Sequence, residues 1–306
     1  MAYVPPIDLN LLTPQFEGFK AGTTLICDLD GPCYVAAAKA KTLPTAIRNV
    51  QQRILELKFL TRCQDAEVHL TPAGSYKAGR FLIKAARPYQ GNRTGKSKPP
   101  LLEALREALA RPENILQDEY SVVMHRDVEA DDGMMYSAYR LKDTGIIWSD
   151  DKDLRMTPYP YYDKELGKVC PAAGFGDVGL AYTPAGNMKP VGQGLKFLWL
   201  QMLMGDRADN ILGLAKLDGK LCGPALAYNS IQGIRAESDT ANFVLDGYRK
   251  INQNPLPEGW LLWLLRWPGD TFWAYLNELE LSGDNLDFIN DCVRRNWFDT
   301  YDTSST

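Results

Sequence analysis

Short β-favouring runs alternate with helical segments across the first half of this chain. The strand candidates are apolar runs of five or six residues, at positions 23–27, 66–71, 120–125 and 145–149. The helix candidates carry apolar residues at helical spacing, at positions 44–60, 101–109 and 130–141. This alternation predicts an α/β fold, in which a mostly parallel central sheet is covered by helices on both faces.

Acidic residues stand where two of these strands end. Asp28 directly follows the first run, and Asp151 and Asp153 follow the fourth. A spacing of two allows Asp151 and Asp153 to point to the same side of an extended segment. Because open α/β folds build their sites at the carboxyl edge of the sheet, we expect these carboxylates to converge there.

Two more acidic clusters lie at predicted helix ends. One opens the helix at 130–141, and the other follows a predicted helix at 195–204. Acidic residues also cap helices, but several such clusters in one chain favour a divalent-metal site, since Mg²⁺ and Mn²⁺ take oxygen ligands and two ions need several carboxylates. The predicted metal ligands are Asp28, Glu129, Asp131, Asp132, Asp151, Asp153, Asp206 and Asp209.

A basic segment separates the first acidic residue from the rest. The chain carries a formal net charge of −4, yet residues 68–102 contain neither Asp nor Glu. This segment predicts a phosphate-facing surface. Within it, Arg93, Lys84 and Arg87 are the predicted catalytic cations, which would stabilise charge on a phosphate. The predicted DNA-binding residues are Tyr89, Asn92, Arg93, Lys96, Lys98 and, further along the chain, Lys220.

Composition narrows the class of protein. The six cysteines are scattered without a Cys-x-x-Cys pair, which argues against a zinc ribbon or a disulfide framework and favours a reducing cytoplasm. Two histidines supply few His-based metal or nucleophile sites. No N-terminal signal peptide and no apolar stretch of membrane-spanning length appear, so we expect no membrane partner. Five of the seven tryptophans lie at positions 260–297, where we expect a packed helical core rather than a base-stacking surface.

The order of these motifs resembles that of the 5′-nucleases, the family of flap endonucleases and bacteriophage 5′→3′ exonucleases. The resemblance covers roughly residues 22–230, and each motif is weak alone, but order and spacing together are fairly specific. The motifs are Asp28 after a strand, Tyr-x-x-Asn-Arg (Tyr89, Asn92, Arg93), Glu-x-Asp-Asp (Glu129, Asp131, Asp132), Asp-Lys-Asp (Asp151, Lys152, Asp153) and Gly-Asp-x-x-Asp-Asn (Gly205, Asp206, Asp209, Asn210).

The resemblance implies a PIN-like nuclease core at 20–194, with a basic helical arch at about 77–110. It implies a helix–hairpin–helix DNA-binding element at 195–235, with a bound K⁺ ion, and leaves a helical Trp-rich region at 236–306. It further implies two Mg²⁺ or Mn²⁺ ions and cleavage of DNA near a free 5′ end. We expect a monomer in the cytoplasm of a bacterium or a phage-infected host, working beside replication proteins.

The chain departs from the family pattern at two informative positions. The family usually has Asp after the second strand, where this chain has Pro72, and Lys after the tyrosine, where it has Gln90. Both departures favour a second hypothesis, in which a protein of the same fold binds DNA with weakened or absent cleavage.

A third hypothesis is a phosphatase. Residues 25–31 also resemble the first motif of haloacid-dehalogenase-like phosphatases, with Asp28 as nucleophile and Asp30 as general acid–base. Thr71, a lysine at 189 or 196 and residues 205–209 would supply the later motifs. That hypothesis leaves Glu129, Asp151 and the basic segment without a role, and Pro32 stands where that motif has Thr.

Overall fold

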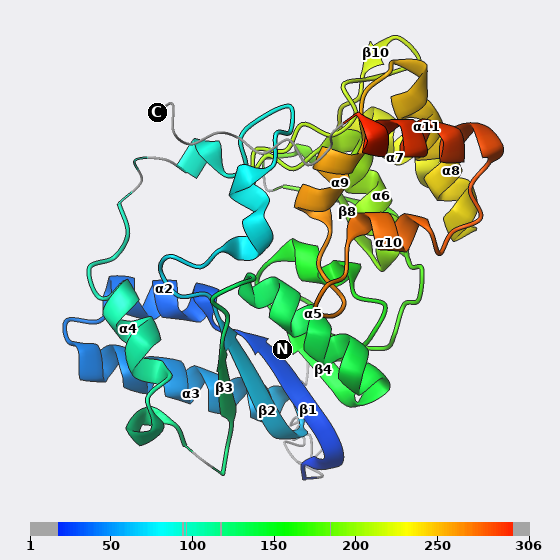
Figure 1. Ribbon diagram of the computed structural model, residues 1–306. Helices are drawn as coiled ribbons and strands as arrows, with labels where there is room; N and C mark the ends of the chain where they lie inside the picture. The colour runs from blue at the N-terminus through cyan, green and yellow to red at the C-terminus, as the bar shows by residue number, and fades with distance from the viewer. Residues whose placement is uncertain (1–17, 94, 96, 117, 184, 296–306) are drawn as a thin grey trace, which may run out of the picture.

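A six-stranded sheet forms the centre of the N-terminal part (Figure 1). The structure is a computed structural model that describes residues 18–93, 95, 97–116, 118–183 and 185–295. The first five strands in the order β3-β2-β1-β4-β5-β6 are parallel, and β6 is antiparallel to β5. The strands are β1 (Lys20–Asp28), β2 (Cys63–Leu70), β3 (Ser121–Met124), β4 (Gly145–Trp148), β5 (Tyr161–Asp163) and β6 (Lys168–Cys170).

Helices cover both faces of this sheet, as the sequence predicts. Leu25 and Cys27 of β1 point to one face, and Ile26 between them points to the other. The first face is packed against α2 (Asp30–Lys39), α3 (Leu43–Thr61) and α4 (Leu102–Leu109), and the second against α5 (Ala130–Leu141). Of these helices, only α2 is unexpected. Its alanine-rich sequence lacks a strong apolar stripe, so periodicity does not reveal it.

Strand β1 lies between β2 and β4. The sheet is extended from β1 in one direction by β2 and β3 and in the other direction by β4 and β5. Such a switch point opens a crevice at the carboxyl ends of the adjacent strands. Asp28 therefore lies next to the residues that follow β4, as expected for converging carboxylates.

The basic segment crosses this edge of the sheet (Figure 1). Among its described residues, the basic segment forms two 3₁₀ turns, η1 (Lys77–Leu82) and η2 (Gly91–Arg93). The region predicted as a helical arch, at about 77–110, ends with the α-helix α4, which packs on α2. Backbone hydrogen bonds tie it down on both sides: Tyr76 N–H donates to Arg126 O at 2.7 Å, and Gln90 N–H donates to Asp209 O at 2.9 Å. The part of the segment at residues 76–93 therefore lies over the carboxyl edge of the sheet, and we call it the roof.

The C-terminal half forms a second, helical layer with its own core. Trp263 stacks on Tyr275 with ring centroids 4.5 Å apart, and both are buried. Trp260 and Trp273 pack partly buried against the same core, as expected, but Trp267 is 44% exposed. Trp297 lies outside the described residues. A β-ribbon of β7 (Asp177–Tyr182) and β8 (Met188–Gln193) precedes this layer. Its helices are α6 (Leu195–Met204), α7 (Pro224–Ile231), α8 (Glu237–Lys250), α9 (Leu256–Leu262), α10 (Phe272–Leu276) and α11 (Gly283–Arg294).

The segment predicted as a helix–hairpin–helix consists of α6, a long turn, a β-hairpin and α7. The hairpin pairs β9 (Lys216–Leu217) with β10 (Lys220–Leu221). Within the part of the chain that the structure describes, every helix is too short or too polar to cross a membrane.

Candidate active site

Asp28 ends β1 and is 6% exposed at the carboxyl edge of the sheet. One carboxylate oxygen accepts the backbone N–H of Asp30 at 2.8 Å, and the other accepts the hydroxyl of Ser149 at 2.7 Å. Ser149 directly follows the neighbouring strand β4, so the strand pairing itself brings the two side chains together. The carboxylate is thereby held in one orientation.

Asp30 brings a carboxylate to the end of β2. Its Oδ1 accepts the backbone N–H of Thr71 at 3.2 Å and lies 2.9 Å from a guanidinium nitrogen of Arg106. Thr71 is followed by Pro72, where the 5′-nuclease pattern expects an acidic residue. The first turn of α2 therefore fills a position that β2 leaves without a carboxylate.

The start of α5 supplies two more carboxylates. Glu129 caps the helix and accepts the Lys77 ammonium at 3.0 Å and the Tyr89 hydroxyl at 2.9 Å. Burial raises the pKa of Asp131 well above its usual range, and the charges of Asp151 and Asp28 raise it further. Asp131 thus faces the carboxylates that follow β4 and β1. We call Asp28, Asp30, Glu129 and Asp131 the first acidic group.

A second acidic group forms from Asp153, Asp206 and Asp209, whose nearest carboxylate oxygens lie within 4.8 Å of one another. Gly205 makes this arrangement possible. It has φ +71°, and a Cβ there would lie 2.3 Å from the backbone oxygen of Ile211. The tight turn that follows α6 therefore requires glycine, and it carries Asp206 and Asp209 back toward the η5 turn (Lys152–Met156) that holds Asp153.

Asp151 lies between the two groups. Burial raises its pKa, and the charges of Asp209 and Asp206 add to this effect. The same Asp151 charge raises the pKa of Asp28 and Asp131 in the first group and of Asp153 in the second. The arrangement is one continuous array with Asp151 shared between its halves.

The array strongly disfavours full ionisation. Burial raises the pKa of Asp28 to about 7, with a further contribution from the charge of Asp30. Burial and the charge of Asp151 raise the pKa of Asp153 to about 6. Closely spaced, buried carboxylates of this kind need a cation, and an all-oxygen donor set fits hard divalent ions such as Mg²⁺ or Mn²⁺.

Lysine and arginine side chains line the same cavity, which has a volume of about 770 Å³. Among its described lining residues, seven carboxyl groups face four cations, so acidic groups outnumber basic ones. The four cations are Lys77, Arg93, Lys98 and Arg106. Arg93 donates to the Asp209 carboxylate, and Lys77 bridges Glu129 to the Gln90 amide oxygen, 3.0 Å from each.

Two predicted catalytic cations lie elsewhere. Lys84 and Arg87 are exposed on the roof segment and do not line this cavity, while Arg93 does. The roof turns between η1 and η2, so neighbouring cations in the sequence face different directions. Of the three predicted catalytic cations, Arg93 is therefore the one placed to contact a ligand in this cavity.

Asp132 has a different role from the predicted metal ligation. It is fully buried, and its two carboxylate oxygens accept the Arg80 guanidinium at 2.7 Å each. One of them also accepts the backbone N–H of Leu265 at 3.0 Å. With both oxygens engaged away from the cavity, Asp132 joins α5 to the roof and to the C-terminal layer.

The predicted DNA-binding residues divide into two sets. Tyr89 and Asn92 brace the roof, since the Asn92 amide donates to Arg207 O at 2.8 Å and Tyr89 donates to Glu129. Lys98 is 61% exposed at the cavity and Lys220 is exposed on β10, so both are accessible to a phosphate. Lys96 lies outside the described residues.

Sequence reasoning missed four residues that shape the site: Lys77, Arg106, Ser149 and Lys152. Lys152 pairs with Asp153 at 2.6 Å and with Asp206 at 2.9 Å, and so joins two carboxylates of the second acidic group. Its place between two aspartates was a usable signal, as was the location of Lys77 in the basic segment. Nothing in the sequence singles out Arg106 on α4.

Comparison with known proteins gives similarity at the level of structure. A search of protein-family models finds no match, and no curated protein is significantly similar in sequence. The bacteriophage T5 D15 protein with metal ions is 16% identical, with a TM-score of 0.46, over 89% of this chain and 99% of its own. The T5 D15 flap endonuclease pseudo-enzyme–product complex with DNA and metal ions is 17% identical (TM-score 0.46, 89% and 98% covered).

A further similar structure is the catalytic core of Rad2 in complex with a DNA substrate. It is 13% identical, with a TM-score of 0.35, over 91% of this chain and 75% of its own. Of these proteins, the T5 D15 protein is a flap endonuclease. The case for an active site in this chain rests on its own carboxylates and cations.

Proposed function

We propose that this chain is a divalent-metal-dependent 5′→3′ exonuclease or flap endonuclease acting on DNA near a free 5′ end. The observation that supports it is the array of two acidic groups linked through Asp151. The first acidic group, Asp151 and Asp209 line a cavity with Lys77 and Arg93, and Asp153 and Asp206 lie beside Asp209. Two oxygen-lined groups suit two ions, and the cations suit a phosphate. The motif order of the 5′-nucleases supplies the choice of substrate.

Each group of residues has a task in this proposal. Asp28, Asp30, Glu129, Asp131 and Asp151 would hold one ion, and Asp151, Asp153, Asp206 and Asp209 the other. Bound Mg²⁺ or Mn²⁺ lowers the pKa of a water molecule and offsets the charge of the phosphate. Lys77 and Arg93 contact the phosphate oxygens, while Ser149 and Arg106 fix the positions of Asp28 and Asp30. Tyr89, which donates to Glu129, would stack on a base.

The remaining predicted partners keep the status of proposals. Lys98 and Lys220 contact the DNA backbone on either side of the cavity, and a K⁺ ion binds beside the β9–β10 hairpin. The enzyme acts as a monomer in the cytoplasm of a bacterium or an infected host, with replication proteins nearby.

The direct test is cleavage of 5′-labelled single-stranded, duplex and 5′-flap DNA with Mg²⁺, Mn²⁺ or EDTA. We expect metal-dependent release of short products from the 5′ end. DNA binding that persists in EDTA, with no cleavage under either metal, would instead establish the binding-only hypothesis. The phosphatase hypothesis gains no support from the structure, because Glu129, Asp131 and Asp151 surround Asp28 in the same cavity.

Stability without metal is expected to depend on pH in an unusual direction. The folded pKa of Asp28, about 7, and of Asp153, about 6, exceed the unfolded value near 4, so the folded state binds more protons than the unfolded state. Their contribution to stability is full below about pH 4 and is lost as the pH rises through 6 to 7. In EDTA, we expect Tm to fall by about 5 °C or more between pH 5 and pH 8.

Thermal melts with and without Mg²⁺ or Mn²⁺ check this expectation. The metals should raise Tm more at pH 8 than at pH 5, since deprotonated carboxylates bind them better. A Tm that rises over this interval in EDTA, together with a metal effect independent of pH, would contradict the assignment of these carboxylates.

A further inference from the structure

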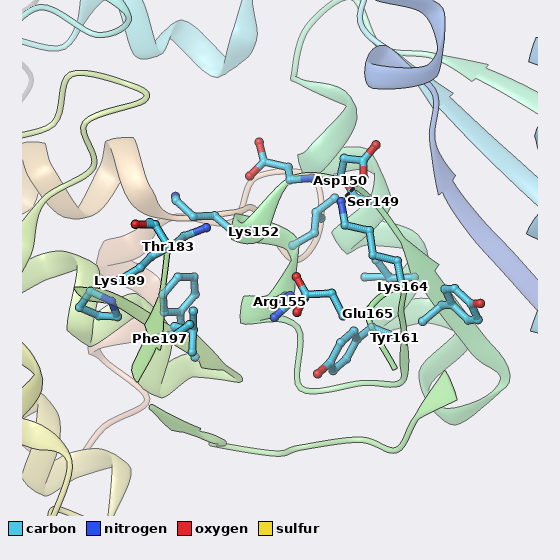
Figure 2. Close-up of a pocket in the computed structure, with 18 of the residues that line it drawn as sticks. Ser149, Asp150, Lys152, Arg155, Tyr161, Lys164, Glu165, Thr183, Lys189 and Phe197 are labelled. Carbon is cyan, nitrogen blue, oxygen red and sulfur yellow. Dashed lines mark hydrogen bonds and ion pairs between the residues drawn. The ribbon is translucent and has the colours of Figure 1, made fainter. Parts of the chain in front are cut away.

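A second cavity, of about 440 Å³, lies beside the active site (Figure 2). Its walls come from the turn after β4, the β5–β6 hairpin, the β7–β8 ribbon and Phe197 of α6. We call it the lateral pocket. Asp150 and Asp151 line both this pocket and the acidic cavity, so the turn after β4 is a common wall. A molecule in the lateral pocket would sit next to whatever the acidic cavity holds.

The lateral pocket combines an apolar floor with a basic rim. Leu154, Tyr161 and Phe197 lie beneath it, each at most 9% exposed, and the accessible apolar surface of this floor comes from Ala181, Tyr182 and Val191 of the β7–β8 ribbon. The rim carries four cations, Lys152, Arg155, Lys164 and Lys189, beside three carboxylates, Asp150, Asp151 and Glu165. In the view of Figure 2, Lys152 and Lys189 lie to the left of the pocket and Lys164 to the right. An apolar floor with cations at the edge suits a ligand that has both a flat apolar part and an anionic part.

Lys189 is the cation most available to such a ligand. Three rim cations have carboxylate partners: Lys152 has Asp153 and Asp206, Lys164 has Asp150, and Arg155 has Asp163. Lys189 is exposed and forms no ion pair with any described residue. It lies opposite Ala181 in the β7–β8 ribbon, so its side chain rises from the same ribbon face as that small residue. The small neighbour leaves the ammonium accessible.

We propose that the lateral pocket binds one nucleotide, with its phosphate on Lys189 and its base over the apolar floor. The volume admits a single nucleotide and excludes a duplex. The nucleotide is either a released nucleoside monophosphate or the end unit of a strand whose neighbouring phosphate lies in the acidic cavity. This deepens the proposed nuclease function, but the binding itself requires no cleavage.

Equilibrium binding in EDTA tests the proposal without any nuclease activity. The probes are 5′-dTMP and a 5′-phosphorylated thymidine tetranucleotide, measured by calorimetry with the full chain. We expect Lys189→Ala to weaken binding about tenfold, as for loss of one charge-assisted contact to a phosphate. Ala181→Trp, which fills the pocket from the same face, should weaken it at least as much. Lys168→Ala, an exposed lysine on β6 outside both cavities, is the matched control and should bind as the unaltered protein does.

The two probes distinguish the two sources of the nucleotide. Loss of both affinities in Lys189→Ala shows that the pocket accepts a free monophosphate. Loss of tetranucleotide binding alone shows that it holds the end of a strand. Unchanged affinity for both probes in Lys189→Ala and in Ala181→Trp overturns the proposal, even if the enzyme cuts DNA. If the chain cuts no DNA but these variants still lose binding, the lateral pocket stands and the nuclease proposal fails.

Discussion

Replacing Asp151 and Asp153 together by alanine should abolish metal-dependent cleavage of DNA. Asp151 is the carboxylate that both acidic groups share, and Asp153 is one of the three residues whose oxygens approach within 4.8 Å. Their removal takes ligands from both halves of the array at once. We expect kcat to fall by at least about 10³-fold, while DNA affinity in EDTA changes little because the cations of the cavity remain.

A second readout separates this result from simple misfolding. Asp153 is partly buried and Asp151 is exposed, and both lie beside other carboxylates, so their removal relieves repulsion. The double variant should therefore match or exceed the Tm of the unaltered protein at pH 8 in EDTA and lose most of the stabilisation by Mn²⁺. The variant with Asp284→Ala and Asp287→Ala, which loses two exposed carboxylates of α11, is the charge-matched control. Undiminished cleavage by the Asp151/Asp153 variant would refute the assignment of the metal site.

The Lys77→Gln variant should lower kcat by about 10²- to 10³-fold with little change in DNA affinity. Its ammonium lies in the cavity between Glu129 and Gln90, where a phosphate held by the acidic groups would be within reach. Loss of one preorganised cation or donor at a reacting group typically has an effect of this size. Glutamine removes the charge and keeps two N–H donors, on a side chain that is one bond shorter.

Moving the charge within the site gives a sharper version of this test. Gln90 contacts Lys77, Tyr89 and Asp209, so Gln90→Lys places an ammonium in nearly the same space. The combination of Lys77→Gln with Gln90→Lys should recover activity to within about tenfold of the unaltered enzyme. Lys84→Gln, on the roof but outside the cavity, should remain near full activity. If Lys84→Gln is as slow as Lys77→Gln, general electrostatics rather than the position of Lys77 governs the rate.

The sequence predicted the sheet, most helices and the convergence of the carboxylates, because each depends on local regularity. Strand runs and helical spacing mark the elements, and the carboxyl-edge rule then places Asp28 next to Asp151. Helix α2 is not predicted from the sequence because it lacks an apolar stripe. The segment 158–194 contains β5 to β8, and these strands are too short for their alternation to be recognised in the sequence.

Single residues in the site were harder to predict for a physical reason. Asp131 and Asp132 are adjacent on α5, about 100° apart around the helix, and sequence gives no indication which of them faces the cavity. The sequence of the roof has neither helical nor strand periodicity, so it does not indicate that Lys77 rather than Lys84 faces the cavity. Asp30 reaches the end of β2 only through the unpredicted helix α2. Such assignments depend on tertiary placement.

The Arg80–Asp132 pair has a consequence for how this protein folds. Arg80 also donates to Trp263 O at 2.7 Å, and Asp132 accepts from Leu265, so one buried pair binds the roof, α5 and the C-terminal layer at a single point. Removing the chain after α8 would take one acceptor from Arg80 and one donor from Asp132 and would open this pair to water. We therefore expect the two layers to melt as one cooperative unit, and loss of the C-terminal helices to disturb the acidic array that α5 helps to form.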